Sequence, residues 1–299
     1  MRLSVAYGVL AVVLLGLIMF FIHAKSSHVP SEDVVARAAV IAAFTDWNQC
    51  TMAHLDSMRS APEKIWNNFA AITTHCTSIT RVSKIKLVPF ESNDGIKHYI
   101  LIFKQVTNPS VVVSLGIGTD IRVEEKLKEL LPENSEFFGA DPVIVPNAAL
   151  FKKVGTFFPY AVSAQTGLQE SKIRLNSGVY QILCVGHIDV LTFFLKIIKR
   201  NYIDHLILDN EGPEYEFLPM IAVNNMFLGN AIYICHMNVV FHDPGPEEGY
   251  AKFAKIMWDL LAAGRFGIIH NLSGGNQRMF IVNYEDRRCI KKYLEQFFK

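Results

Sequence analysis

The sequence predicts a doubly wound α/β fold with helices on both faces of a mostly parallel sheet. From about residue 84 onward, strand-like and helix-like segments alternate, and right-handed crossovers place helices on both sides of such a sheet. Residues 111–115, VVVSL, form the short β-branched run that is typical of a buried parallel strand. The 299 residues include 51% hydrophobic and 19% charged side chains, which excludes a disordered chain.

The N-terminal segment predicts a membrane anchor. Residues 3–22 carry no charged side chain, and about 20 apolar residues in a helix span the roughly 30 Å hydrocarbon core. A cleaved signal peptide, with its shorter apolar core of about 7–15 residues, is the alternative. We therefore expect residues 1–25 to be a transmembrane signal-anchor, with the rest of the chain in the lumen of the endoplasmic reticulum or Golgi. Cleavage would instead give a secreted protein.

A lumenal location bears on one asparagine and four cysteines. Asn271 begins an Asn-Leu-Ser sequon, which predicts a glycoprotein. Cys50 and Cys76 lie in a polar helical region and are expected to pair in an oxidising compartment. Cys184 and Cys235 lie in strand-like apolar runs and are expected to be buried free thiols. No Cys-x-x-Cys or His-Glu-x-x-His spacing occurs, so no metal site is predicted.

Residues 26–83 are expected to form a stem and a helical extension. Ser31 is a candidate N-cap, and Glu32 and Asp33 follow it in the first turn, where the helix dipole favours anions. Pro62 is suited to the first turn of a second helix. The simplest role of this extension is packing against the domain at 84–299.

The first half of that domain alternates strands with helices. Asn108-Pro109 marks a turn before the strand at 111–115. Residues 121–131 place apolar side chains on one rough helical stripe, whereas Pro146 breaks the helical pattern at 143–154. The other expected strands are 96–106, 135–141 and 157–164, followed by strands or a hairpin at 171–176 and 179–186.

The second half repeats the alternation and ends in a strand pair. Pro219 is expected to kink the helix at 214–228, and Gly264 is placed to end the helix at 247–264. The loop at 273–276 suits a tight return, so the last strand is expected to run antiparallel. The other expected elements are helices at 189–201 and 286–298 and strands at 203–209, 231–242, 266–272 and 278–284.

A glycine-rich turn joins the strand at 111–115 to the next helix. Gly116, Gly118 and Asp120 lie in this turn, where glycine lets the backbone approach a ligand. A dinucleotide fingerprint needs a third glycine, but that position is Ile121, and no Gly-Lys-Ser/Thr P-loop occurs. Asp141 closes the next strand, where it is placed either to bind ribose hydroxyls or to cap a loop. This combination suits S-adenosylmethionine, which has a ribose and an adenine but no phosphate.

A second cluster of acids follows the strand at 203–209. Asp209 and Glu211 are expected near the mouth of the sheet, because ligands bind beyond the carboxyl ends of parallel strands. Either is a candidate general base, with His242, which follows a later strand, as a reserve. Glu214 and Glu216 are more simply explained as first-turn acids that compensate a helix dipole.

Several of these motifs together resemble one family. The run LDNEGPEYEFL resembles the KIDVEGAE-type signature of FkbM-like methyltransferase domains, VVVSLGIGTD resembles that family's first motif, and FFGADP resembles its second. ICHMNVVFH and RMFIVNYEDRRCIKKYL resemble the tail of a membrane-anchored branch. The resemblance covers about residues 85–298. It implies a class I methyltransferase fold with a seven-stranded sheet, bound S-adenosylmethionine and O-methylation of a sugar or small-molecule hydroxyl.

Departures from the family pattern leave alternatives open. Ile207 replaces a lysine, Pro213 an alanine and Ser114 an acid, and the acid of a later run is Val240. A methyltransferase fold that binds without catalysis is therefore one alternative, and a lumenal glycosyltransferase is another. The expected acceptor is a small molecule or glycan. The formal net charge of +1 argues against a nucleic-acid partner.

Overall fold

The computed structural model describes residues 32–100, 108–175, 177–245 and 248–299. Residues 36–299 form one compact unit. The expected anchor at residues 1–25 lies outside the described residues. Among the helices that the structure does describe, none is both long and apolar enough to cross a bilayer.

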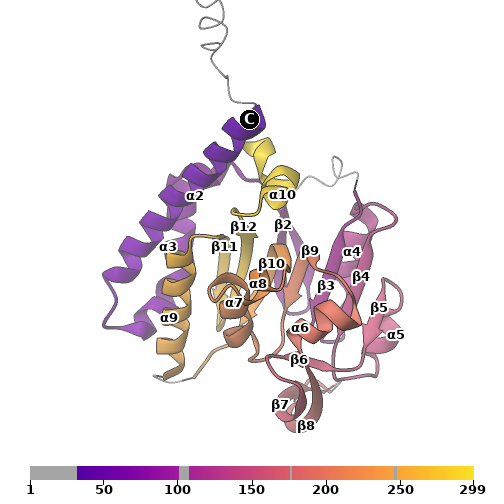
Figure 1. Ribbon diagram of the computed structural model, residues 1–299. Helices are drawn as coiled ribbons and strands as arrows, with labels where there is room; N and C mark the ends of the chain where they lie inside the picture. Colours follow the sequence, from indigo (N-terminus) through magenta and orange to yellow (C-terminus); the bar gives the residue numbers. More distant parts are fainter. Residues whose placement is uncertain (1–31, 101–107, 176, 246–247) are drawn as a thin grey trace, which may run out of the picture. The chain divides into compact units, whose positions relative to one another are not determined.

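The centre of the unit is a seven-stranded sheet with the order β11-β12-β10-β9-β3-β4-β5 (Figure 1). The chain enters at the interior strand β3, builds one edge through β5, and then builds the rest of the sheet from the middle strand β9. The pairs from β10 to β5 are parallel, whereas β12 is antiparallel to both its neighbours. The prediction of a mostly parallel sheet with an antiparallel last strand is therefore confirmed. The strands are β3 (Val111–Leu115), β4 (Glu136–Ala140), β5 (Thr156–Phe158), β9 (Tyr202–Leu208), β10 (Tyr233–Phe241), β11 (Phe266–Gly274) and β12 (Asn276–Asn283).

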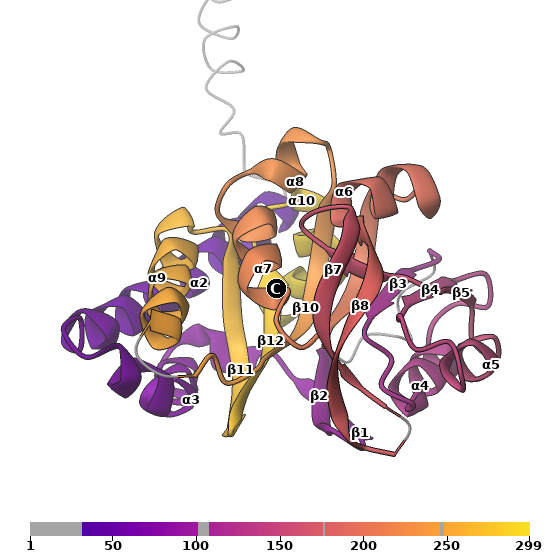
Figure 2. The same cartoon turned by 90° about the horizontal axis from the view of Figure 1, so that it is seen from below.

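Three long helices lie along the β11 edge of this sheet (Figures 1 and 2). They are α2 (Glu32–Asp56), α3 (Pro62–Ile79) and α9 (Glu248–Ala263). Trp66 and Phe69 of α3 pack their rings edge-on against Phe253 of α9, at centroid distances of 4.7 and 5.4 Å. The expectation that the helical extension packs against the domain is confirmed.

The shorter helices depart from the sequence pattern in three places. The last helix, expected at 286–298, forms α10 (Arg287–Cys289), then a π-helical stretch at Ile290–Leu294 and a 3₁₀ turn at Glu295–Phe297. The segment expected as a helix at 189–201 forms one turn, α6 (Val190–Thr192), and then a π-helical stretch at Phe193–Ile197. The helix expected at 214–228 is divided by Asn225, whose φ of +54° is left-handed. The remaining helices are α4 (Arg122–Leu130), α5 (Asn147–Phe151), α7 (Glu214–Ala222) and α8 (Met226–Gly229).

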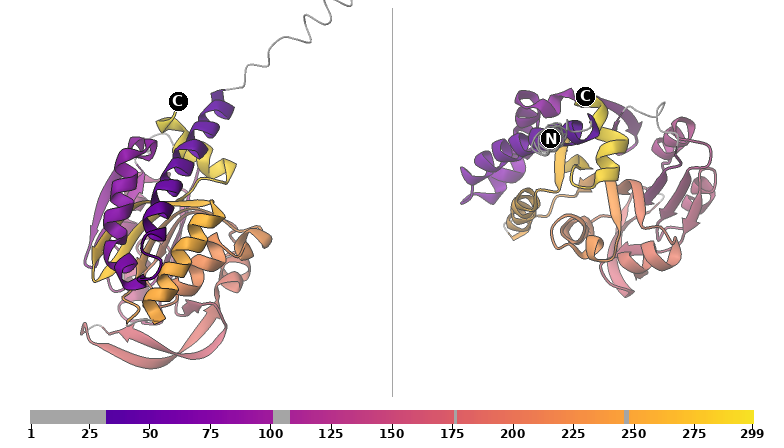
Figure 3. Two further views of the ribbon diagram at one scale, coloured as in Figure 1. Left: turned by 90° about the vertical axis from the view of Figure 1, so that its left-hand side faces the viewer. Right: turned by 45° about the horizontal axis from the view of Figure 1, so that its top comes forward.

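Two small sheets flank the carboxyl ends of the main strands. One is the hairpin of β1 (Leu87–Ser92) and β2 (Gly95–Ile100), of which the sequence pattern predicted only the second strand. The other contains β6 (Ala161–Ser163), β7 (Gly167–Arg174) and β8 (Tyr180–Asp189). Its β7–β8 hairpin extends beyond the main sheet (Figures 1 and 3).

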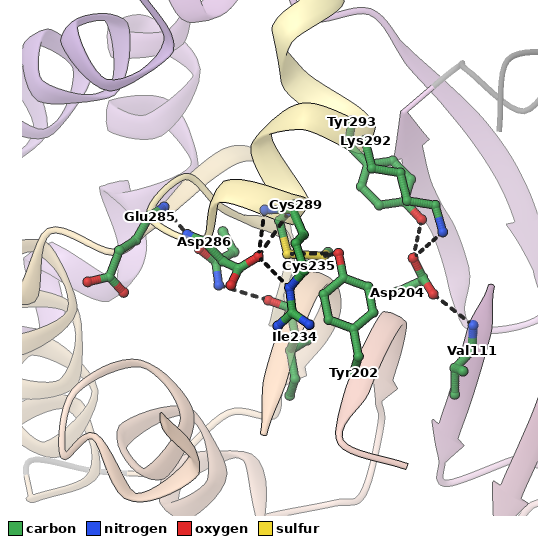
Figure 4. The surroundings of a disulfide bond; sticks show 12 residues. Val111, Tyr202, Asp204, Ile234, Cys235, Glu285, Asp286, Cys289, Lys292 and Tyr293 are labelled. Atoms are coloured by element: carbon green, nitrogen blue, oxygen red, sulfur yellow. Dashed lines mark hydrogen bonds and ion pairs between the residues drawn. A yellow bond between two sulfur atoms is a disulfide. The ribbon is translucent and has the colours of Figure 1, made fainter. Parts of the chain in front are cut away.

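The cysteines form two disulfides. The predicted Cys50–Cys76 bond is confirmed. The prediction of a free thiol at Cys235 is wrong, because this buried residue of β10 pairs with Cys289 of α10 (Figure 4). Cys184 is free but exposed rather than buried, since β8 belongs to the projecting hairpin and not to the main sheet.

The fold does not support glycosylation of Asn271. This residue of β11 is buried, and its Nδ2 donates to Gln277 Oε1 on β12 at 2.8 Å. A glycan on Nδ2 would break that hydrogen bond and would need space that the packed sheet does not leave.

A buried carboxylate ties the C-terminal segment to the sheet (Figure 4). Asp204 Oδ1 on β9 accepts hydrogen bonds from Lys292 Nζ and Tyr293 Oη, both at 2.6 Å. Its Oδ2 accepts the backbone N–H of Val111 at 2.9 Å. One side chain thus joins β9, the start of β3 and the C-terminal helical turns.

Candidate functional site

A pocket of about 170 Å³ opens where β3, β4 and β9 end. This is the edge of an open α/β sheet at which ligands bind. Residues of the β1–β2 and β7–β8 hairpins form its outer walls. All seven residues that the sequence singled out line it: Gly116, Gly118, Asp120, Asp141, Asp209, Glu211 and His242.

The loop after β3 has a backbone that side chains rarely tolerate. Gly116, Gly118 and Thr119 have φ values of +83°, +59° and +68°. A Cβ added to Gly116 would lie 2.0 Å from the backbone oxygen of Asp209, whereas a Cβ on Gly118 would meet only Asp94 Oδ2, at 3.6 Å. Gly116 is therefore required for the contact between two strand ends, and Gly118 leaves open space at the pocket.

Asp141 holds this loop in place. Its Oδ2 accepts the backbone N–H groups of Ile117 and Gly118 at 2.8 and 3.3 Å, and its Oδ1 accepts that of Val143 at 2.7 Å. The loop-capping role considered from the sequence is thus present. Asn147, which sequence reasoning missed, adds a bond from Thr119 N to its Oδ1 at 3.0 Å.

Asp120 lines the pocket with its oxygens already engaged. They accept the backbone N–H of Asn93 at 2.6 Å and the guanidinium of Arg122 at 2.8 and 2.9 Å. Burial acts to raise the pKa of Asp120, but these hydrogen bonds outweigh it and lower the pKa to about 2. Asp120 therefore fixes the loop to the β1–β2 turn.

His242 lies among three carboxylates. Its Nε2 is 3.3 Å from Glu211 Oε1 and 3.6 Å from Asp209 Oδ1, while its Nδ1 is 2.9 Å from Glu214 Oε1. Glu214 also accepts the backbone N–H groups of His242 and Gly212, at 3.0 and 2.7 Å. This fully buried acid begins α7, but its carboxylate binds His242, so dipole compensation does not describe its role.

The surroundings shift the pKa values of His242, Asp209 and Glu211 in different ways. Burial acts to lower the pKa of His242, but Glu211 and Glu214 outweigh it and raise the pKa to about 10, so the ring is protonated at neutral pH. Burial raises the pKa of Asp209, against the opposing charges of Lys97 and His242. Burial would also raise the pKa of Glu211, but its bonds to His242 and Tyr180 hold that pKa below its usual value.

Comparison with protein families matches residues 49–266 to the methyltransferase FkbM domain. The chain belongs to the FkbM methyltransferase domain family. It is also 20% identical over 236 residues to the uncharacterized protein C28H8.7 of Caenorhabditis elegans, which covers 78% of this chain and 75% of that protein. The matched FkbM region begins within α2, so it includes most of the helical extension.

The FkbM domain closes one side of its pocket with the β7–β8 hairpin. Tyr180 Oη donates to Glu211 Oε1 at 2.7 Å, and Lys172 Nζ lies 3.6 Å from Glu211 Oε2. Arg174 Nη1 binds Asp94 Oδ1 at 2.9 Å and so joins this hairpin to the β1–β2 turn. Sequence reasoning missed these residues because no motif marks a hairpin that folds back over a distant strand end.

The acid missing from β3 of this FkbM domain has a neighbouring substitute. Ser114 Oγ donates at 2.6 Å to Oε1 of Glu124, a buried residue of α4 that lines the pocket. Burial raises the pKa of Glu124. The serine that replaces the strand acid was the only sequence feature that pointed here.

The charge on His242 predicts a stability that falls at alkaline pH. Its pKa is about 10 in the folded protein against 6.5 for an unperturbed ring. A raised folded pKa gives a stabilisation that is complete below 6.5 and is lost as the pH rises through about 10. The free energy of urea unfolding should therefore fall across this window. His242→Gln should remove most of that fall, and an NMR titration that finds an unshifted ring would contradict the assignment.

Proposed function

We propose that this FkbM domain is an S-adenosylmethionine-dependent methyltransferase that O-methylates a hydroxyl of a sugar or small molecule. The observation that carries the proposal is the pocket that is lined both by the glycine loop after β3 and by Asp209, which directly follows β9. Membership of the family supports methyl transfer over the glycosyltransferase alternative.

Two features of the pocket fit this cofactor. The open space at Gly118 is a cradle that a side chain would fill. Asn210 lines the pocket, and its buried Oδ1 has no hydrogen-bond partner among the described residues. A ligand rich in hydroxyl and amino donors satisfies such an acceptor.

The loop at Gly116–Gly118 and Asp141 would hold the cofactor. Asp141 accepts three backbone N–H bonds, and a carboxylate has about four acceptor sites, so one remains for a ribose hydroxyl. When bound, S-adenosylmethionine supplies a methyl group on a positively charged sulfur. The rate gain expected from the protein comes mainly from holding the acceptor in line with that group.

Asp209 is the general base that the electrostatics favour. Its raised pKa makes it a better proton acceptor near neutral pH than Glu211, whose pKa is lowered. His242 is protonated and cannot accept the proton of the acceptor hydroxyl. We assign it instead to holding Asp209 and Glu211 in place, with Lys97 Nζ 3.3 Å from Asp209 Oδ2.

A binding protein without catalysis is the second candidate. Val240, where the family run carries an acid, is buried on β10 and offers no polar group. Binding of S-adenosylmethionine without methyl transfer to any tested hydroxyl acceptor would favour this candidate.

Calorimetric titration of the full-length protein with S-adenosylmethionine tests the cofactor assignment. Gly118→Val should abolish measurable binding, because the added side chain enters the cradle. Asp141→Asn should weaken binding by about 10- to 150-fold, since it removes charged hydrogen bonds worth about 1.5–3 kcal/mol. Glu129→Gln, on an exposed face of α4, is the matched control and should bind as the parent does. A folded parent that does not bind refutes the proposal.

We also propose that residues 1–25 anchor the chain with the FkbM domain in the lumen, as in the membrane-anchored branch of the family. Two disulfides among the described residues support an oxidising compartment. The anchored protein should stay with membranes during alkaline carbonate extraction. Recovery of the full-length chain in the soluble fraction would refute the anchor.

A further inference from the structure

We propose that Cys50, His54, His75 and Cys76 form a zinc site when the Cys50–Cys76 disulfide is reduced. This inference is independent of the proposed methyltransferase activity. Cys50 and His54 lie four residues apart on α2 and therefore share a face of that helix. His75 and Cys76 are adjacent on α3.

The side chains already converge in the oxidised protein. One ligand atom from each of Cys50, His54 and His75 lies within 4.8 Å of the other two. The two imidazole rings meet edge-on with centroids 5.5 Å apart, and Cys76 Sγ is bonded to Cys50 Sγ. Within the part of the chain that the structure describes, the ring nitrogens of His54 and His75 have no hydrogen-bond or ion-pair partner. Both rings are therefore free to bind an ion.

The helix pair that carries these ligands is also joined by contacts other than the disulfide. Trp47 of α2 is fully buried, and its Nε1 donates to Thr77 Oγ1 of α3 at 3.1 Å. Leu55 of α2 and Phe69 of α3 are fully buried in the same hydrophobic core. After reduction, Cys50, His54 and His75 therefore stay close together, with Cys76 next to Cys50.

The site forms in two steps, reduction of the disulfide and then binding of the metal ion. A dithiol reductant gives two electrons and two protons to the sulfur–sulfur bond, which breaks into two thiols while the reductant becomes a disulfide. Zn²⁺ then binds two thiolates and two neutral imidazoles, and the two thiol protons are released. A tetrahedral Cys₂His₂ site needs the sulfurs about 3.7 Å apart. Side-chain rotation supplies this separation, because the two Cα atoms are 5.8 Å apart.

The site is reached from the side of Cys50. His54 and His75 are exposed and Cys50 is half-buried, whereas Cys76 is fully buried, so a reductant and a metal ion reach the disulfide at Cys50. Two thiolates and two imidazoles in a tetrahedral arrangement favour zinc over harder cations. Zinc would then keep α2 and α3 joined under conditions in which the disulfide is lost.

Zinc binding to the full-length protein tests the proposal, before and after treatment with a phosphine reductant, which does not itself chelate zinc strongly. All proteins carry Cys184→Ser, which removes the exposed free thiol. Reduction should create one site for Zn²⁺, and Co²⁺ in its place should show the intense visible absorption of a tetrahedral thiolate complex. The oxidised protein should bind at least about 100-fold more weakly, since two of four ligands are then lost.

Two sets of variants separate ligation from folding. His54→Gln and His75→Gln replace exposed side chains, so the fold should survive, and each should weaken zinc binding by about 100-fold or more. Cys50→Ser with Cys76→Ser should abolish binding. The proposal is overturned if the reduced, folded protein binds no zinc, or if the histidine variants bind it as tightly as the parent.

Discussion

Gly116→Ala is expected to lower the free energy of unfolding by about 2–5 kcal/mol. A left-handed backbone costs a residue with a side chain about 1–2 kcal/mol, and overpacking of a close contact adds about 1–3 kcal/mol. Both apply at Gly116, where φ is +83° and an added Cβ would lie 2.0 Å from the Asp209 backbone oxygen. The backbone of β9 must move to make room, so the pocket should be distorted as well. Urea unfolding monitored by circular dichroism measures the change in the free energy of unfolding.

Two further glycines serve as controls for this variant. Gly118→Ala has a similar left-handed backbone, with a φ of +59°, but only Asp94 Oδ2 near the added Cβ. It should therefore lower the free energy of unfolding only by the cost of the left-handed backbone conformation, about 1–2 kcal/mol. Gly186→Ala, which meets nothing within 4 Å, should be close to neutral. If Gly116→Ala costs no more than Gly118→Ala, the close approach of β3 and β9 at this point is wrong.

Asp204→Ala is expected to destabilise the protein by about 3–5 kcal/mol, the usual cost of removing one partner of a buried ion pair. The change leaves Lys292 Nζ, Tyr293 Oη and the Val111 N–H without their shared acceptor. The C-terminal helical turns should loosen first, because they contribute two of the three donors. Hydrogen exchange of that segment and the urea midpoint together measure the effect.

Asp56→Ala is the matched control for that variant. Asp56 pairs with Arg59 at 2.9 Å, but both side chains are exposed, and such surface pairs contribute about 0–1 kcal/mol. If Asp204→Ala lowers the free energy of unfolding no more than Asp56→Ala does, the buried network does not support the fold.

The strands of the main sheet were predictable because buried strands consist of consecutive apolar residues. VVVSL at β3 and the run at β9 have buried side chains on both faces, and a parallel sheet requires this. The glycine turn was equally readable, because it directly follows a strand. β1 was missed because it belongs to a separate two-stranded sheet and has a single buried side chain, so it contains no such run.

The candidate site was predictable in its members but not in their pairing. Asp209, Glu211 and His242 were placed together because parallel strands share one carboxyl edge. The full burial of Glu214 and its bond to His242, 28 residues away, depend on the angle at which α7 packs against β10. No local pattern encodes that angle, and the charge on His242 follows from it. Cys235 and Cys289 were missed for a similar reason, since their 54-residue separation is bridged only by the folded C-terminus.

The Cys235–Cys289 bond also determines how the molecule resists force. Its two cysteines are 54 positions apart, and the chain between them includes α9, β11 and β12, so one covalent ring holds an edge of the sheet to its interior strand β10. A pull on the C-terminus is transmitted through Cys289 directly to β10, and the ring cannot be drawn out as extended chain. A machine that unravels the chain from its C-terminal side must therefore first release the turns that Asp204 holds. It then meets a ring attached to the interior strand β10, which can leave the sheet only when its neighbouring strands also yield.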